Sequence, residues 1–377
     1  MDTYILLQQY WWFIISLLGG ILAFLLFVQG TNSMLFSIGR TETERGLIIA
    51  STGRKWEFTF TTLVLFGGAF FASFPLFYST SFGGAYWLWM IILFSFVLQA
   101  VSYEFQHNEG NLLGKSVYRS FLVANGIIAP FLLGVAIATF FTGADFIIDK
   151  SSLQDSSMPV ISRWTSAWNG LEALLVPWNL IMGFAVLFLS RCLGNLYIIN
   201  SIADENLACR SSVRLVGNAV VFLLFFVTFV IHVLLSPGCE VGQTGEITIV
   251  PYKYWDNFIT LWPILLTFLV GVLLVLYGIV RTVLSSSWCK GIWPTGVGTI
   301  ITVTSLLLCA GWNHTCYYPS VSDVQSSLHL SNSCSSLFTL QTMTWVSILI
   351  PFVLIYIWYA WRSISKKKIT PDELEEY

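Results

Sequence analysis

Long apolar runs separated by shorter polar segments dominate the hydrophobic pattern of this chain. A helix that crosses a hydrocarbon layer needs about 20 mostly apolar residues. Such runs are expected to be helical, because lipid offers the backbone no other hydrogen-bond partner and barrel strands would be nearer ten residues each. Nine predicted spans lie near residues 10 to 30, 58 to 78, 85 to 105, 120 to 141, 173 to 195, 214 to 235, 257 to 280, 291 to 312 and 340 to 361.

The pattern predicts an all-α, polytopic membrane protein of about nine transmembrane helices. The polar segment 142–165 separates the first four spans from the last five. We therefore expect two helical bundles, four plus four, with one extra peripheral helix. Residues 1–141 would form the first bundle and 142–165 an outer loop. The second bundle, the peripheral last helix and a short cytoplasmic tail would occupy 166–377.

Composition supports a membrane protein and excludes a nucleic-acid partner. The 377 residues are 56% hydrophobic and only 10% charged, whereas soluble domains carry roughly 25% charged residues. The formal net charge of −2 provides no basic surface to neutralise phosphates. The N-terminus, MDTYILLQQYWW, has no positively charged segment and no small-residue cleavage site before its apolar run, so it is expected to be a retained first span.

Lysine and arginine are distributed unevenly between the two sides of the predicted spans. On one side lie Arg40, Arg45, Arg54, Lys55, Lys115, Arg119, Arg191, Arg210, Arg214, Arg281, Lys290, Arg362, Lys366, Lys367 and Lys368; on the other lie only Lys150, Arg163 and Lys253. Basic residues concentrate in cytoplasmic loops. The N-terminus is therefore expected outside and the C-terminus in the cytoplasm.

Few ionisable residues lie inside or at the edges of the predicted spans, where such residues are functional candidates by default. They are Glu57, Glu104, Glu172, Arg191 and His232. The first span ends in Gln29 and Asn32, the second begins with Trp56 and Glu57, and the third ends with Gln99, Tyr103 and Glu104. Three consecutive helices would thus bring polar groups to one level, in the cytoplasmic third of the membrane.

Two carboxylates beside buried amides could pass protons inward from the cytoplasm. A simpler interpretation is that Glu57 occupies the first turn of its helix, favoured by the helix dipole and by Arg54 and Lys55. Glu104 could likewise reach the membrane interface. Glu172, Arg191 and His232 lie near the ends of their spans. The simplest interpretation is that their side chains extend to the nearest membrane surface.

Histidines and cysteines show no pattern of a bound metal. No HxxxH, CxxC or CxxCH sequence occurs, so we predict that this chain binds neither haem iron nor another metal. Cys239, Cys316 and Cys334 fall on the predicted outer side, where disulfides can persist. We hypothesise a Cys316–Cys334 bridge, with independent unpaired cysteines as the alternative.

Two stretches of the chain resemble subunit II of cytochrome bd-type quinol oxidases. The first contains, without a gap, Trp56, Glu57, Leu63, Gly67, Gly68, Ala69, Phe71, Ala72 and Pro75. The second contains Ser335, Ser336, Thr339, Leu340, Met343, Pro351, Leu354 and Tyr356. The pair Trp11-Trp12, the TERG at 43–46 and the acid Glu104 are also similar. The resemblance covers nearly the whole chain and depends on the order and spacing of these residues.

The resemblance implies a heterodimer in which subunit I holds haems b and d and the quinol site, and reduces oxygen to water with cytoplasmic protons. In that family the proton path of subunit II includes the acid after the tryptophan, which is Glu57 here, beside Trp56. Glu104, Gln99, Gln29 and Asn32 would support it. The family often has aspartates where this chain has Gln29-Gly30-Thr31-Asn32. Amides cannot hold a proton as carboxylates do, so Glu57 would carry more of the transfer.

We therefore expect the haem-free subunit II of a terminal oxidase of the aerobic respiratory chain, in the bacterial inner membrane. Two other functions stay open. A proton-coupled transporter would require paired helices broken at the membrane midplane, and no such pair is evident. A purely structural scaffold subunit would need no proton path. The sequence also leaves open a small third subunit, an embedded quinone or lipid, the quinone used and the route of oxygen.

Overall fold

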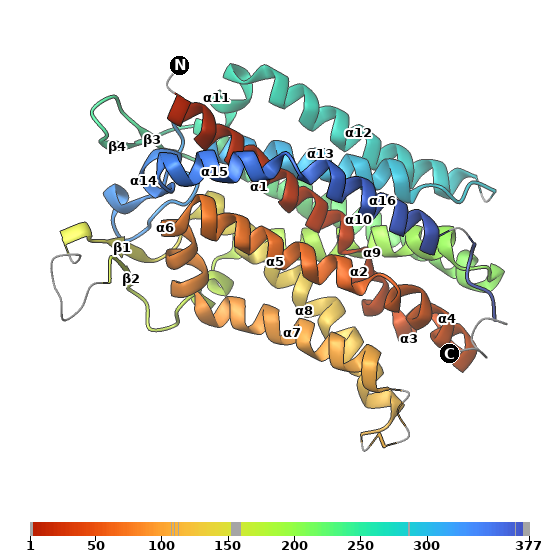
Figure 1. The fold of residues 1–377 in the computed structure, drawn as a ribbon. Helices are drawn as coiled ribbons and strands as arrows, with labels where there is room; N and C mark the ends of the chain where they lie inside the picture. The colour runs from red at the N-terminus through yellow and green to blue at the C-terminus, as the bar shows by residue number, and fades with distance from the viewer. Residues whose placement is uncertain are drawn as a thin grey trace.

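The computed structural model describes residues 3–106, 108, 110–111, 113–151, 160–285, 287–365 and 367–371. Long helices run side by side through the molecule (Figure 1). Among the described residues, eight helices are long and apolar enough to cross a membrane, or nine when one bent pair counts as a single span. The predicted all-α, polytopic class is therefore confirmed. Residues 152–159 of the predicted outer loop, Lys366, and residues 372–377 of the predicted tail lie outside the described part.

In the described part of the first half, three helices can cross a membrane, and a fourth span is present when the bent pair counts as one. The helices of this half are α1 (Thr3–Leu25), α2 (Phe27–Ser33), α3 (Leu35–Ile38), α4 (Glu42–Gly53), α5 (Trp56–Ser73), α6 (Pro75–Phe77), the π-helix η1 (Tyr78–Gly84), α7 (Tyr86–Phe105) and α8 (Lys115–Thr142). A capping box between Thr41 and Glu44 starts α4. The chain bends by 119° between α5 and the segment that begins at Pro75, because proline has no N–H to continue a helix. The second span thus ends earlier than the predicted 58–78.

The second half contains the remaining spans. Its helices are η3 (Leu171–Leu175), α9 (Pro177–Ser201), α10 (Glu205–Leu235), α11 (Lys253–Thr260), α12 (Trp262–Leu284), α13 (Ile292–Gly311), η4 (Val324–Ser326), α14 (Leu330–Ser333), α15 (Leu337–Ser347) and α16 (Ile350–Ile364). Pro177 begins α9 and Asp204 caps α10, as expected for helix starts. The last two helices are mostly exposed, which agrees with a peripheral final span.

Two small hairpins cover one end of the helices. Strand β1 (Phe146–Ile148) pairs antiparallel with β2 (Ser162–Trp164), and β3 (Gly238–Val241) pairs antiparallel with β4 (Ile247–Val250). Figure 1 shows both hairpins at the end that carries the N-terminus, with the C-terminus at the opposite end. Termini at opposite ends agree with an odd number of spans.

Helices from the two halves pack closely together. Helix α1 lies against α13, and α2 and α8 lie against α9. Gly30 of α2 brings its backbone against that of α9, since a Cβ added there would fall 1.8 Å from the carbonyl oxygen of Ser190. The division into bundles at 1–141 and 166–377 stays a prediction.

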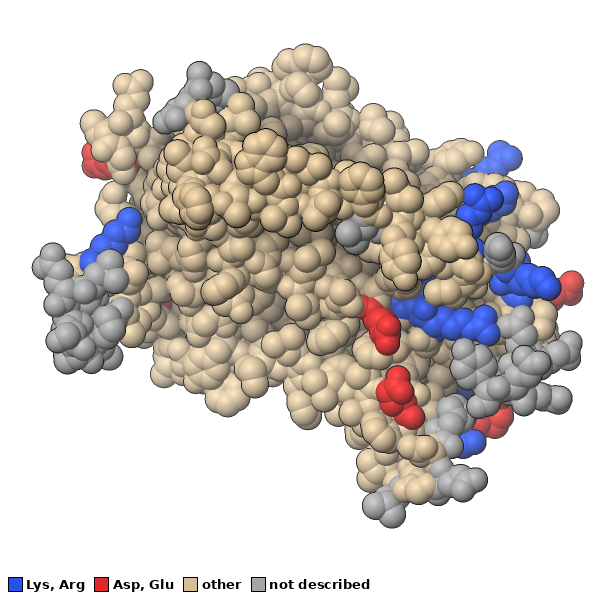
Figure 2. Space-filling view, viewed as in Figure 1, with Lys and Arg blue, Asp and Glu red and all other residues tan. Residues whose placement is uncertain are grey.

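Charge is concentrated at one end of the molecule. In Figure 2, lysine and arginine gather at the end that carries α3, α4 and the C-terminus, while a broad uncharged band covers the middle. An uncharged band between polar ends is the surface that a membrane protein presents to lipid.

Candidate functional site

A cluster of buried amides joins the first, third and fourth spans. Gln29 and Asn32 lie on α2, and both side chains are fully buried. Gln29 Nε2 donates to Oε1 of the buried Gln99 on α7 at 3.1 Å. Asn32 Nδ2 lies 2.9 Å from the Tyr103 hydroxyl, which in turn lies 3.0 Å from Asn32 Oδ1. The structure therefore brings together three of the predicted site residues.

Helix α7 presents its polar groups along one line. Ser95, Gln99 and Tyr103 are spaced four residues apart and so share one face of the helix. Asn125 of α8 donates through Nδ2 to Ser95 Oγ at 3.2 Å. The cluster thus runs along α7 from the level of Tyr103 toward the centre of the bundle.

Three buried atoms of this cluster have no hydrogen-bond partner among the described residues: Gln29 Oε1, Gln99 Nε2 and Asn125 Oδ1. Leaving a buried donor or acceptor unpaired costs about 1–3 kcal/mol. Polar groups of this kind are the usual partners of buried water. The cluster can therefore extend its hydrogen bonds through water along the inner face of α7.

Two acids lie beside the cluster, on the exposed surface of α5 and α7. The Trp56 and Tyr103 rings stack with centroids 5.9 Å apart and planes at 19°, which holds the start of α5 against the end of α7. Glu57 and Glu104 follow these two rings by one residue each. Both side chains are exposed on this chain, and neither carboxylate has a hydrogen bond or ion pair with another described residue.

Lys55, although adjacent to Glu57 in the chain, is directed elsewhere. Its side chain is buried, and Nζ lies 4.7 Å from the ring centroids of both Tyr197 and Trp361. These cation–π contacts hold the ammonium group away from an ion pair. Lys55 therefore makes no direct contact that would stabilise Glu57 in the first turn of α5.

The other ionisable residues of the spans have local contacts. Glu172 accepts hydrogen bonds from Trp164 Nε1 and from the Gly170 amide. Arg191 donates to Ser33 Oγ at 3.1 Å. His232 stacks on Trp178 with centroids 3.6 Å apart. None of these residues joins the amide cluster, and among the described residues no group of three or more His, Cys, Asp or Glu could hold a metal ion.

Sequence analysis placed Tyr103 among the polar groups at the end of the third span, one helical turn from Gln99, but it missed one amide of the cluster, Asn125. Asn125 is an amide in the middle of an apolar span, which is itself a signal of a buried polar contact. Trp56, one of the predicted site residues, contacts the cluster through Tyr103. Its packing beside Glu57 stays a prediction.

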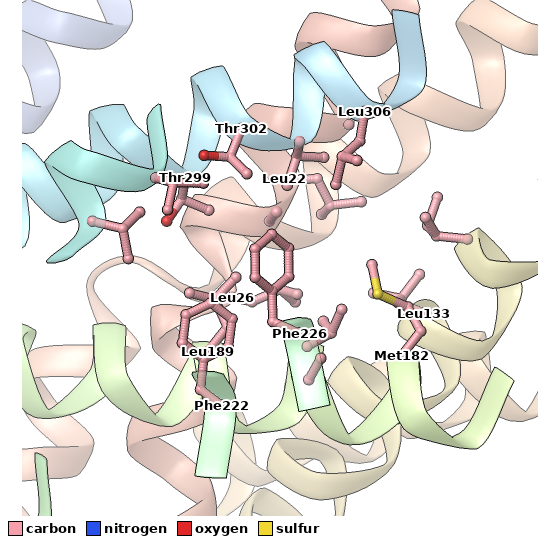
Figure 3. Close-up of a pocket in the computed structure, with 18 of the residues that line it drawn as sticks. Leu22, Leu26, Leu133, Met182, Leu189, Phe222, Phe226, Thr299, Thr302 and Leu306 are labelled. Atoms are coloured by element: carbon pink, nitrogen blue, oxygen red, sulfur yellow. The ribbon is translucent and has the colours of Figure 1, made fainter. Parts of the chain in front are cut away.

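An apolar cavity lies deeper in the bundle. It holds about 970 Å³ of space not filled by atoms, including its open mouth. Figure 3 shows Leu22, Leu133, Met182, Leu189, Phe222, Phe226 and Leu306 around it, with Thr299 and Thr302 on one wall. The hydroxyls of both threonines donate to carbonyl oxygens of their own helix, at 2.8 Å each. The cavity wall is therefore almost wholly hydrocarbon.

The thiols at the end that carries the hairpins are separate in the structure. Cys334 Sγ lies 2.9 Å from the Tyr4 hydroxyl and 3.1 Å from Gln8 Nε2. Cys316 is fully buried and packs with Cys239 and Ile247. The Cys316–Cys334 bridge stays a prediction.

Comparisons with known proteins agree on one family. The model of the family described as cytochrome bd terminal oxidase subunit II matches residues 7–364. The chain is 24% identical to cytochrome bd-I ubiquinol oxidase subunit 2 of Escherichia coli K12, aligned over 100% of this chain and 98% of that protein. It is 25% identical to cytochrome bd ubiquinol oxidase subunit 2 of Bacillus subtilis, over 88% of each. A chain of the bd oxidase from Geobacillus thermodenitrificans shares the fold, with a TM-score of 0.61 at 13% identity, over 96% of this chain and 98% of that one.

Proposed function

Because this chain belongs to the family of cytochrome bd terminal oxidase subunit II, we propose that it stabilises a haem-bearing subunit I and helps to conduct cytoplasmic protons to the site of oxygen reduction. Membership makes it a subunit of a quinol oxidase, an oxidoreductase of the respiratory chain, and a multi-pass protein of the bacterial inner membrane. In the proposal this chain is haem-free and the haems belong to subunit I. The observation that carries the proposal is the buried amide cluster flanked by Glu57 and Glu104.

Each part of the cluster has a different role in the proposed transfer. Only a carboxylate takes up and releases a proton readily, so Glu57 and Glu104 would hold it. Amides and the Tyr103 hydroxyl can orient a chain of hydrogen bonds without holding a charge. The unpaired atoms of Gln29 and Gln99 give water molecules partners along that chain.

The same two acids indicate which face meets subunit I. On α5 the exposed positions Glu57, Thr61, Val64, Leu65, Gly68 and Phe71 follow one helical stripe. Glu104 ends a similar stripe on α7, which includes the exposed Phe94 and Val97. A charged group against lipid is costly, whereas a partner subunit can supply hydrogen bonds to it. We therefore assign this α5–α7 face to subunit I.

The orientation of the chain follows from its charge. Basic residues at the end that carries α3, α4 and the C-terminus (Figure 2) favour a cytoplasmic position for that end. The hairpins and the N-terminus would then face outward. Protons would reach Glu57 and Glu104 from the cytoplasmic side.

A transporter is less well supported than an oxidase subunit. It would need paired discontinuous helices near the midplane of both halves. Among the described residues one bent pair occurs, at Pro75 in the first half. A purely structural subunit would explain the α5–α7 face but not the buried amide cluster.

Purification through a tag on this chain tests the assignment. We expect a second, larger membrane subunit to accompany it, with a reduced-minus-oxidised spectrum of haems b and d and quinol-driven oxygen consumption. The haem signal should remain with the larger subunit when the two are separated. Mass spectrometry of the same sample would identify any small third subunit. A tagged chain that arrives without haem or oxidase activity would favour the transporter.

The apolar cavity is the proposed place of an embedded lipid or quinone. Its hydrocarbon wall suits an acyl or isoprenoid chain, which gains about 0.8 kcal/mol per buried CH₂. Replacing Ala185, which lines the cavity, with phenylalanine should fill part of the space. We expect organic extracts of the Ala185→Phe complex to contain at least about two-fold less of a lipid or quinone that the unmodified complex retains through purification. An unchanged extract would contradict this placement.

A further inference from the structure

Two cysteines face each other where a third strand-like segment joins the β3–β4 hairpin. Glu240 of β3 forms an antiparallel bridge with Thr315. The Cys316 amide donates to the Cys239 carbonyl at 3.0 Å, and the Val241 amide donates to the His314 carbonyl at 2.9 Å. This register places Cys239 directly opposite Cys316.

The register also places both side chains on the same face. Residues opposite each other in an antiparallel pair project to one side of the sheet. Cys239 and Cys316 are both buried and form a small apolar cluster with Ile247. Cys239 and Cys316 share one of the two backbone hydrogen bonds of a facing antiparallel pair. A pair that forms both has Cα atoms about 5.5 Å apart, which lies inside the range of about 4.4–6.8 Å for a disulfide.

The other cysteines near this end are engaged elsewhere. Cys334 Sγ is held by Tyr4 and Gln8 of α1. Cys309 lies on α13, and its Sγ contacts the Tyr254 carbonyl at 3.6 Å. Cys239 is therefore the partner that the backbone register gives to Cys316.

We propose that Cys239 and Cys316 form a disulfide, and the separate thiols of the structure represent its reduced form. The proposal rests on the proposed orientation, which puts the hairpin in the oxidising outer compartment. The two thiols lose two protons and two electrons as the S–S bond forms. A disulfide-carrying thiol oxidase of that compartment accepts them and is reduced to its dithiol. The bridge would tie the β3–β4 hairpin to the loop after α13.

Peptide mapping of the complex, denatured in the presence of N-ethylmaleimide and digested without reduction, tests the bridge. We expect a linked peptide that joins Cys239 to Cys316 and separates on reduction. Cys239→Ser should leave Cys316 open to alkylation after denaturation and lower the midpoint of thermal unfolding by roughly 5 °C. Cys334→Ser is the matched control and should leave the linked peptide intact. A Cys316–Cys334 peptide, or alkylation of both Cys239 and Cys316 without reduction, would overturn the proposal.

Orientation is measured separately on the exposed Cys209 of α10. A membrane-impermeant maleimide should label it in inside-out vesicles and not in right-side-out vesicles. Labelling from the outside would overturn the proposed orientation and, with it, oxidation of the thiols in the outer compartment. The peptide map tests the disulfide itself, independently of the orientation.

Discussion

Replacing Glu57 with glutamine is expected to lower quinol-driven oxygen consumption of the purified complex roughly 10-fold or more, since a positioned proton-transfer group contributes about 10² to 10⁴ in rate. Glutamine keeps the size of the side chain but cannot hold a proton. Glu104 remains as a second acid and limits the loss. The measurement is turnover at saturating quinol, alongside the reduced-minus-oxidised haem spectrum, which should not change.

Matched variants separate proton transfer from assembly. Glu57→Asp keeps a carboxylate and should retain more activity than Glu57→Gln. Glu205→Gln alters an exposed acid at the start of α10, away from the amide cluster, and should leave turnover unchanged. Full activity of Glu57→Gln would remove Glu57 from the proton path, and loss of the haem spectrum would assign Glu57 to assembly instead.

The fold was largely predictable because lipid imposes one strong rule. Each apolar run must satisfy its own backbone hydrogen bonds, so span number and type follow from run length. The early end of α5 was less predictable, because Pro75 lies inside an apolar run and its bend depends on local backbone geometry. The hairpins were not predicted, since strands of three or four residues leave little periodic signal.

Most members of the candidate site were predictable, but Asn125 and the arrangement of the cluster were not. Rare polar residues in apolar spans pointed to Gln29, Asn32, Gln99, Glu57 and Glu104. The pairing of α2 with α7 and the outward position of the two acids depend on helix packing, which the polar pattern does not encode. The proposed partner of Cys316 could not be predicted from spacing, because the register between β3 and a segment about 75 residues later is a tertiary property.

Gly30→Ala is expected to prevent normal assembly of the complex, although it adds only one methyl group. The added Cβ would lie 1.8 Å from the Ser190 carbonyl oxygen and 2.7 Å from the Arg191 amide nitrogen. Both are backbone atoms of α9, so no side-chain rotation relieves the clash. We expect a destabilisation of at least about 3 kcal/mol, at the upper end of overpacking costs.

The clash would also reach the site, because Gly30 lies between Gln29 and Asn32 on α2. Gly194 on α9 makes the reciprocal close approach, since a Cβ there would fall 2.5 Å from the Thr31 amide nitrogen. The measurement is the amount of haem-bearing complex recovered through a tag on this chain. Gly217→Ala is the control, because Gly217 lies exposed within α10 with nothing within 4 Å of an added Cβ. Normal recovery and thermal stability of Gly30→Ala would show that α2 and α9 do not need this backbone contact to hold the amides in place.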